Sequence, residues 1–292
     1  MEFIKFKTIL TKVKDGKEWY GIDYNMNLYR GCSHGCIYCD SRSDCYHIDN
    51  FDIVRGKEGV LNILEQELSK KRHKGVIGIG AMSDTYNPQE LKYEQTRGAL
   101  KLISKYGFGV SIDTKSDLIL RDIDLLKEIN SKNNVIVKFT ITTPLDELSK
   151  IIEPHVCVSS KRLQAIKILS DNGIFTGIMM NPMLPFITDK EEDIKLLVKL
   201  AKMHGAKFIH TYMGMTLREN QRDYYYDKLD KYFIGVKEKY IKYYKNRYEC
   251  VVPNVKKLYK VFTDECDKYG ILYKMDDIIN AYKKDNEQMS LF

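Results

Sequence analysis

Six short apolar runs alternate with stretches of helical periodicity along the first 212 residues of the chain. The runs lie at Tyr24–Tyr29, Val76–Met82, Phe108–Thr114, Val135–Thr142, Ile174–Met180 and Phe208–Tyr212. Between them, apolar positions recur at helical spacing, and the clearest stripe comprises Ile194, Leu197, Val198 and Ala201. The strand runs are largely apolar rather than alternating, which is typical of strands buried on both faces of a parallel sheet. The pattern therefore predicts an α/β fold.

The number and spacing of these units favour a partial barrel. Six strand–helix units within about 200 residues are typical of a TIM-type architecture, so residues 1–218 are expected to form a partial (β/α)6 barrel. A doubly wound open sheet is the competing arrangement. Residues 219–285 predict consecutive helices with no convincing strand, and they are expected to form a helical extension, followed by an exposed tail at 286–292.

Composition narrows the class of protein without naming a function. Hydrophobic residues make up 43% of the chain and charged residues 30%, which excludes a disordered or collagen-like protein. The net charge of +7 is mild, and it permits a polyanionic partner without requiring one. No stretch approaches the ~18 consecutive apolar residues of a membrane-spanning helix, and the N-terminus lacks a secretory pattern. We therefore expect a cytoplasmic protein with no membrane partner.

Three of the seven cysteines give the strongest chemical signal in the sequence. Cys32, Cys36 and Cys39 follow the first predicted strand at C-x3-C-x2-C spacing. Thiolates are soft ligands that suit iron–sulfur clusters or zinc. A structural zinc site needs a fourth ligand, for which His34 and Cys45 are the nearby candidates. A four-iron cluster on three cysteines would instead leave one iron free to bind a substrate or cofactor.

The segment from Gly31 to Cys39, with Tyr38 before the last cysteine, resembles the radical S-adenosylmethionine (radical SAM) superfamily. The resemblance implies a [4Fe–4S] cluster on the three cysteines, whose free iron binds the amino and carboxylate groups of S-adenosylmethionine. It also implies that an electron, delivered by a donor such as ferredoxin or flavodoxin, passes from the reduced cluster and cleaves that cofactor to a 5′-deoxyadenosyl radical. Tyr38 matches the aromatic position that the superfamily places against the adenine.

Longer segments are similar to one branch of this superfamily, the spore photoproduct lyase-like group that is often described as DNA repair photolyases. The similarity runs from about Asn25 to Pro185 and rests on the segments at 27–39, 82–88, 114–117 and 121–122. It implies that Ser83 and Asp84 lie near the amino end of the cofactor. It also implies that Lys115 and Thr140 hold the cofactor's carboxylate, by charge and by a hydrogen bond. Without the resemblance, Lys115 would be a solvated loop lysine and Thr140 an ordinary strand residue.

One position departs from this branch. Spore photoproduct lyase carries a hydrogen-donating cysteine beside the Ser-Asp pair, where this chain has Met82, which has no transferable S–H. Cys45, Cys157 and Cys266 are the candidate replacements, although an ordinary buried thiol is the better explanation for each. Reversal of a thymine dimer by that enzyme's mechanism does not follow from the sequence.

Three further positions lie in or directly after predicted strands. Asn181, with the proline after it, resembles the segment that flanks adenine in the superfamily, although a strand-ending turn explains it too. His210 and Tyr212 belong to the last predicted strand and are candidates to point into the barrel. A structural role is the alternative for both.

Two features near the C-terminal end of the sequence suggest macromolecular partners. Six Lys and Arg residues between positions 231 and 247 surround a single acid and are interleaved with tyrosines. Cations neutralise phosphates and tyrosines stack on extruded bases, so this stretch is a candidate DNA-binding surface, with a solvated helix face as the alternative. Gln288, Leu291 and Phe292 fit a pattern that resembles the peptide by which bacterial DNA repair and replication proteins dock on the DNA sliding clamp.

Together these features predict a lyase-like radical SAM iron–sulfur enzyme whose substrate is damaged or modified DNA. A radical SAM enzyme that acts on a peptide or small metabolite is one alternative. A non-enzymatic iron–sulfur binding module docked on the sliding clamp is another.

Overall fold

A computed structural model of the chain describes residues 1–14 and 19–283. The clamp-docking residues predicted above, Gln288, Leu291 and Phe292, lie outside the described residues. The strands are β1 (Phe3–Ile4), β2 (Thr11–Lys12), β3 (Tyr24–Met26), β4 (Tyr29–Arg30), β5 (Arg55–Lys57), β6 (Val76–Ile79), β7 (Gly109–Thr114), β8 (Val135–Thr140), β9 (Phe175–Met180), β10 (Ile209–Thr211), β11 (Gly214–Thr216) and β12 (Glu249–Val251). The α-helices are α1 (Val60–Lys70), α2 (Glu90–Tyr93), α3 (Gln95–Lys105), α4 (Ile123–Lys132), α5 (Asp146–Ile152), α6 (Ser159–Asp171), α7 (Glu191–Met203), α8 (Gln221–Tyr232), α9 (Val236–Tyr244), α10 (Val255–Tyr269) and α11 (Met275–Tyr282).

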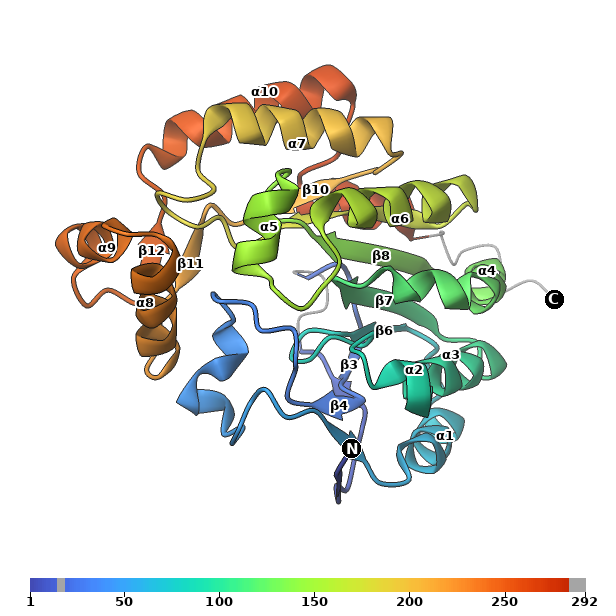
Figure 1. The fold of residues 1–292 in the computed structure, drawn as a ribbon. Helices are drawn as coiled ribbons and strands as arrows, with labels where there is room; N and C mark the ends of the chain where they lie inside the picture. The colour runs from blue at the N-terminus through green and yellow to red at the C-terminus, as the bar shows by residue number, and fades with distance from the viewer. Residues whose placement is uncertain (15–18, 284–292) are drawn as a thin grey trace.

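Six of the strands form a parallel arc in the order of the sequence. β3, β6, β7, β8, β9 and β10 lie side by side, and β2 adds an antiparallel edge strand next to β3. All six predicted strands are confirmed, each somewhat shorter than its apolar run. A doubly wound sheet would reverse its strand order at a switch point. The partial barrel is therefore correct, and within the described residues the arc stays open (Figure 1).

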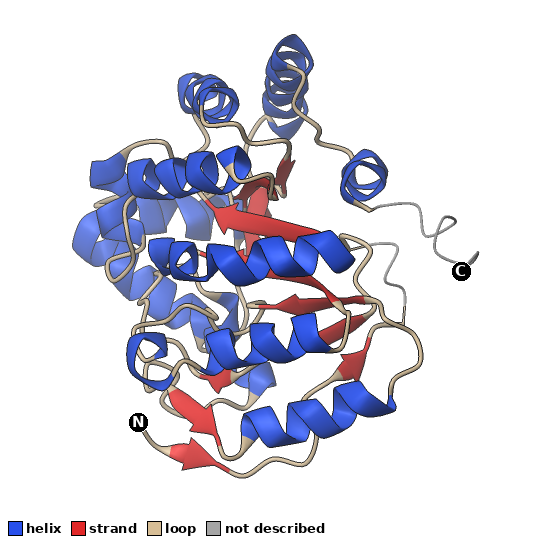
Figure 2. Cartoon of the chain, turned by 90° about the vertical axis from the view of Figure 1, so that its right-hand side faces the viewer, coloured by secondary structure: helices blue, strands red, loops and turns tan. Residues whose placement is uncertain are grey.

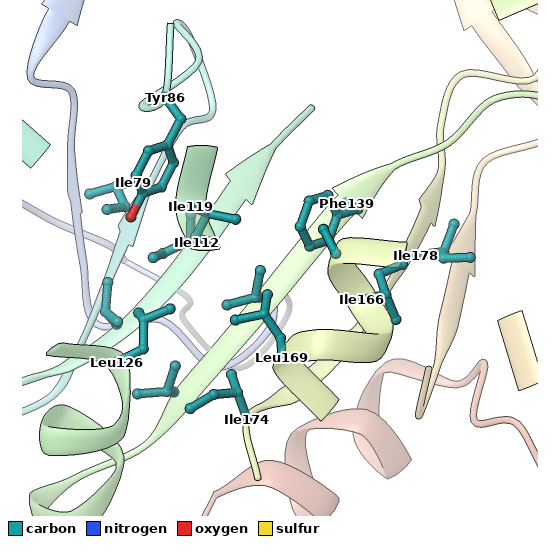
Figure 3. Close-up of a cluster of buried hydrophobic side chains, with 14 of the residues drawn as sticks. Ile79, Tyr86, Ile112, Ile119, Leu126, Phe139, Ile166, Leu169, Ile174 and Ile178 are labelled. Carbon is teal, nitrogen blue, oxygen red and sulfur yellow. The ribbon is translucent and has the colours of Figure 1, made fainter. Parts of the chain in front are cut away.

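A hydrophobic layer joins the outer face of the arc to its helices. Figure 2 shows the helices stacked over the strands on one side. In Figure 3, Leu126 of α4 and Ile166 and Leu169 of α6 lie over Ile112 and Phe139 of the sheet, and all five side chains are 0% exposed. Complete burial of such a side chain contributes about 1.5–3 kcal/mol to the stability of the fold. This layer fixes the strands, and so the positions of the residues at their ends.

Aromatic side chains cover the inner face of the arc where its strands begin. Tyr20 and Phe208 pack with ring centroids 5.8 Å apart, and Tyr282 of α11 donates its hydroxyl to the carbonyl of Tyr20. Val76, the first residue of β6, and Ile136, the second residue of β8, belong to the same buried cluster. The amino ends of the strands are thus filled by protein, which leaves their carboxyl ends as the place for a ligand.

The prediction that no strand follows residue 219 is wrong. β12 pairs antiparallel with β11. A strand of three residues is too short to give a periodic signal, and only Cys250 at its centre is buried. Of the helices in this segment, α10 packs on α7 (Figure 1), whereas α8 and α9 pack against the loop that carries Cys36 and Tyr38. The described residues contain no helix that is both long and apolar enough to span a membrane.

Candidate active site

One pocket at the carboxyl ends of the strands gathers all the residues that were predicted to bind the cluster or its cofactor. Its wall includes Cys32, Cys36, Cys39, Tyr38, Ser83, Asp84, Lys115 and Thr140. The cysteines and the tyrosine come from the loop between β4 and β5, and the other residues end or follow β6, β7 and β8. In barrel folds this end of the strands carries the active site. The fold thus assembles one site from segments that lie far apart in the sequence.

The cysteine-bearing loop is fixed on two sides. Gly31 has a φ of +79°, and a Cβ there would lie 2.4 Å from the carbonyl oxygen of Ile53, so only glycine fits before the first cysteine. On the other side, Ile37 donates its backbone N–H to the carbonyl of Ile152, at the end of α5, at 3.0 Å. The loop is therefore packed closely on itself at Gly31 and held by the end of α5 at Ile37.

The three thiols are withdrawn from solvent. Cys32 and Cys36 are buried, and Cys39 is half-buried. Burial raises the pKa of Cys32 to about 11, and it also raises the pKa values of Cys36 and Cys39. Such thiols stay protonated at neutral pH unless a bound metal deprotonates them. A desolvated group of sulfur ligands of this kind suits an iron–sulfur cluster, whose binding would release protons.

The two candidates for the fourth ligand of a zinc site have different surroundings. In the part of the chain that the structure describes, no group of three or more His, Cys, Asp or Glu side chains is placed to hold a metal ion. Nδ1 of His34 lies 3.6 Å from Oδ2 of Asp84. Cys45 is exposed, with its sulfur 3.5 Å from Nη1 of Arg218. His34 thus lines the same pocket as the three cysteines and lies close to a carboxylate, whereas Cys45 is not part of that lining.

Lys115 and Tyr38 contribute a charge and a ring to the pocket. Nζ of Lys115 lies 5.8 Å from the centre of the Tyr38 ring. Burial alone would lower the pKa of Lys115, but neighbours that include Cys36 and Glu153 raise it above its ordinary value. The ammonium therefore stays charged, and it is complementary to a carboxylate ligand.

The carboxylate of Asp84 is engaged by groups of the protein itself. Its Oδ1 accepts the hydroxyl of Thr114 and the backbone N–H of Tyr86, both at 2.8 Å. Its Oδ2 accepts the backbone N–H of Lys115 at 2.7 Å. A carboxylate with three donors has little capacity left for a ligand. The geometry favours a role for Asp84 in joining the ends of β6 and β7.

Ser83 and Thr140 are the two hydroxyl-bearing residues of the predicted set. Ser83 donates its hydroxyl to the carbonyl of Gly31 at 2.5 Å, so its oxygen keeps lone pairs that can accept from an ammonium group. Thr140 is 9% exposed at the end of β8. Its carbonyl accepts Nη1–H of Arg162 at 2.8 Å, which fixes the backbone beside the pocket.

A buried charge pair beside the pocket was missed by the sequence analysis. Asp113 lines the pocket, and its Oδ1 lies 3.1 Å from Nζ of Lys138, which is 1% exposed. Lys138 also donates to the hydroxyl of Ser111 at 2.8 Å. Burial raises the pKa of Asp113 and lowers that of Lys138, and each charge opposes the shift of the other. The available signal was the alternation along β7, which places Ser111, Asp113 and Lys115 on one face.

Three other candidate site residues, Asn181 after β9 and His210 and Tyr212 at β10, lie outside the wall of the pocket. His210 packs edge-on against Trp19 and Tyr20, with ring centroids 5.6 Å and 5.8 Å apart. Tyr212 is 38% exposed, and its backbone N–H donates to the side chain of Asn181. All three residues thus contact the protein itself, and none of them lines the pocket.

The thiols named as candidate hydrogen donors have different surroundings. Met82 lines the pocket. Cys157 donates its thiol to the carbonyl of Lys115 at 3.2 Å, so it lies directly behind the wall. Cys266 is 0% exposed within the core that α10 shares with the barrel, which separates it from the site.

Comparisons with known proteins agree with this geometry. The radical SAM superfamily model matches residues 26–217, more than half of the chain. An uncharacterized protein of Methanocaldococcus jannaschii is 37% identical over 175 residues, which cover 59% of this chain and 64% of that protein. An uncharacterized protein of Mycobacterium tuberculosis is 29% identical over 209 residues, which cover 69% of this chain and 61% of that protein. The matched region is thus less than two thirds of each relative's length.

Solved structures show the same fold. Spore photoproduct lyase complexed with dinucleoside spore photoproduct matches with a TM-score of 0.67 at 15% identity, over 92% of this chain and 80% of that one. A mutant of that enzyme with bound AdoMet and the dinucleoside has a TM-score of 0.65 at 15% identity, over 91% and 79% of the two chains. The family match and the three-cysteine pocket lead to one conclusion: the chain belongs to the radical SAM superfamily, whose members bind a [4Fe–4S] cluster and S-adenosylmethionine.

Proposed function

We propose that this chain cleaves S-adenosylmethionine reductively and uses the resulting 5′-deoxyadenosyl radical to abstract hydrogen from damaged or modified DNA. The observation that carries the proposal is the fold shared over 92% of the chain with spore photoproduct lyase complexed with dinucleoside spore photoproduct. A bound [4Fe–4S] cluster supplies the electron for cofactor cleavage, and radical SAM enzymes take that electron from a reductant. The chain's own residues bind, orient and shield the reactants.

The wall of the pocket divides into groups with different tasks. Cys32, Cys36 and Cys39 are proposed to ligate three irons and to leave the fourth for the cofactor. Tyr38 presents its ring beside them, where it is proposed to pack against the adenine. Because these four residues share one loop, cluster and adenine are held by a single rigid segment.

Polar groups at the strand ends are proposed to hold the methionine part of the cofactor. The charged ammonium of Lys115 suits its carboxylate, with a further hydrogen bond from the hydroxyl of Thr140. The hydroxyl oxygen of Ser83 can accept from its amino group. Asp84 contributes indirectly, because it fixes the backbone of Lys115 rather than facing the ligand.

A groove between α9, β12 and the start of α10 supports DNA as the substrate. It encloses about 870 Å³, and its lining includes three cations and two exposed tyrosines, namely Arg247, Lys256, Lys257, Tyr243 and Tyr248. Tyr243 is 54% and Tyr248 42% exposed, whereas Tyr240 and Tyr244 are buried in the core. Exposed rings offer stacking faces for bases, and the cations offer contacts to phosphates. From the predicted basic stretch, Arg247, Tyr243 and Tyr248 are among the residues that line this groove.

Contacts connect the groove to the cluster loop. The hydroxyl of Tyr248 accepts Nη2–H of Arg218 at 2.5 Å, and Nε–H of the same guanidinium donates to Oδ1 of Asp40 at 3.1 Å. Asp40 directly follows Cys39. Arg218 therefore links one residue of the groove wall to the cluster loop.

Binding to oligonucleotides at several salt concentrations tests the DNA part of the proposal. We expect an affinity that falls as salt rises, and we expect Arg247→Ala with Lys256→Ala to weaken binding about tenfold and to reduce the salt slope by about two. Lys70→Ala, on the exposed side of α1, is the control and should leave binding unchanged. Equal binding by the double variant and the control would contradict the groove.

The reaction itself is tested with deuterated, modified oligonucleotides. Deuterium transfer into 5′-deoxyadenosine is the expected result. Cofactor cleavage without deuterium transfer or DNA binding would favour a peptide or small-metabolite substrate. No cofactor cleavage by the cluster-loaded protein would favour a binding module. Cys157→Ala tests whether Cys157 is the hydrogen donor. The thiol of Cys157 is the candidate because it lies directly behind the pocket wall, 3.2 Å from the carbonyl of Lys115.

Docking on the DNA sliding clamp is a separate proposal that rests on the sequence alone. The pattern of Gln288, Leu291 and Phe292 supports it. A pull-down against the clamp tests it with the full chain and a chain that ends at residue 287. Equal capture of both would refute the docking.

A further inference from the structure

A buried Tyr–Glu–Arg network lies behind the cofactor pocket. The hydroxyl of Tyr38 donates to Oε1 of Glu153. The second oxygen of that carboxylate, Oε2, lies 2.5 Å from Nη1 of Arg162. Tyr38 is 7% exposed, Glu153 1% and Arg162 0%, so the whole network is shielded from water.

Stability alone does not explain these buried charges. Two charges that leave water lose hydration that their mutual attraction only partly restores, and apolar residues of similar volume commonly give an equally stable core. Buried charges with specific partners beside a cleft are candidates for a functional role. Here the carboxylate accepts from a residue of the pocket wall itself, which suggests what that role is.

Arg162 also fixes the backbone of two other parts of the wall. Its Nη1–H donates to the carbonyl of Thr140 and its Nε–H to the carbonyl of Cys157, both at 2.8 Å. The thiol of Cys157 in turn donates to the carbonyl of Lys115 at 3.2 Å. Tyr38, Thr140 and Lys115 all line the pocket, and they therefore share one buried support.

We propose that Glu153 and Arg162 are positioning residues that hold Tyr38, Thr140 and Lys115 in the arrangement that binds S-adenosylmethionine. The hydroxyl of Tyr38 is engaged behind the wall, so only its ring is available to the ligand. Freed from Glu153, the ring would lose its fixed orientation, and cofactor binding would have to restore it. This inference depends on the cofactor and not on the identity of the substrate.

Tyr38→Phe is the most direct test, because it removes one hydroxyl and keeps both the ring and the Glu153–Arg162 pair. Tyr29→Phe is a matched control: Tyr29 donates its hydroxyl to Glu90, which is paired with Arg121 at 2.7 Å, and it does not line the pocket. We expect Tyr38→Phe to raise the Kd for S-adenosylmethionine about tenfold, as for a lost hydrogen bond to a charged group. Tyr29→Phe should leave that Kd within about twofold of the starting protein.

Two further measurements separate positioning from general damage. Iron content and the urea midpoint of Tyr38→Phe should stay close to those of Tyr29→Phe, while the cofactor-induced change in the EPR spectrum of the reduced cluster should need about tenfold more cofactor. Glu153→Gln leaves Tyr38 an acceptor but leaves Arg162 without its countercharge. If that variant folds, its Kd should lie between those of the starting protein and Tyr38→Phe. An unchanged Kd in Tyr38→Phe, or an equal rise in Tyr29→Phe, would overturn the proposal.

Discussion

The backbone N–H of Lys115 donates to Oδ2 of Asp84 at 2.7 Å, and this contact joins the ends of two neighbouring strands at the edge of the pocket. Asp84 follows β6, and Lys115 follows β7. The same carboxylate accepts the hydroxyl of Thr114 at 2.8 Å, so one side chain fixes both strand ends. The backbone that bears the Lys115 side chain is thereby fixed before a ligand binds. Less conformational entropy is then lost when the ammonium group engages the ligand.

Asp84→Asn should loosen this junction. An amide has one acceptor oxygen and cannot accept donors on both sides, and hydrogen bonds to a charged group contribute about 1.5–3 kcal/mol. We expect a loss of about 2 kcal/mol in the free energy of unfolding and a roughly tenfold weaker binding of S-adenosylmethionine. Urea denaturation and cofactor titration measure the two effects. The exposed substitution Asp227→Asn is the control, and an equal loss in both variants would count against the junction.

Cys36→Ala should abolish cluster binding without unfolding the chain. A four-iron cluster that loses one of three thiolate ligands is not held, so we expect iron to fall from about four per chain to background, with an unchanged far-UV circular dichroism spectrum. Cys266→Ala is a matched control, because Cys266 is also buried but lies in the outer core. It should keep its iron and lose about 1 kcal/mol of stability. Normal iron content in Cys36→Ala would remove this thiol from the ligand set.

Most of the fold could be predicted from the sequence, because each strand of the arc carries its own apolar signal. β8 is buried along its whole length, which is the environment that its apolar run predicts. β12 was not predicted, because a strand of three residues is too short to show a periodic pattern of apolar positions. The cysteines were predicted from a motif and the other pocket residues from a family resemblance of short segments, and both are local features of the sequence.

The support of the pocket could not be predicted in the same way. Glu153 and Tyr38 are separated by 115 positions, and nothing near either residue marks it as half of a pair. Arg162 lies on a helix, where an arginine is ordinarily exposed, yet it is 0% exposed here. Such contacts depend on how α5 and α6 pack against the cysteine loop, which is a property of the tertiary structure.

Lys138→Met should destabilise the chain strongly. It leaves the carboxylate of Asp113, which lies 3.1 Å from Nζ of Lys138, without its countercharge in a site that is largely shielded from water. Loss of one partner of a buried pair costs about 3–5 kcal/mol. Adding Asp113→Asn should recover part of that loss, and a double-mutant cycle by urea denaturation measures the coupling. Strictly additive effects would show that the two residues act independently.

His210 should make stability depend on pH. Burial, together with the nearby charge of Lys138, lowers the pKa of this imidazole below its ordinary value of 6.5. As the pH falls through about 6.5, the unfolded chain gains a proton that the folded chain does not, so the free energy of unfolding declines. The decline ends at the lowered pKa of the folded state, below which both states are protonated. It amounts to about 1.4 kcal/mol for each unit by which the pKa is lowered.

His210→Phe tests this titration, because it keeps an aromatic ring against Trp19 and Tyr20 and removes the proton-binding group. Near neutral pH, the difference in free energy of unfolding between the variant and the starting protein reflects packing alone. From about pH 7 to about pH 5.5 that difference should shift in favour of the variant, because only the starting protein carries the linked proton. Urea denaturation of both proteins at several pH values measures it. A difference that stays constant with pH would show that the imidazole is no harder to protonate in the fold than in the unfolded chain.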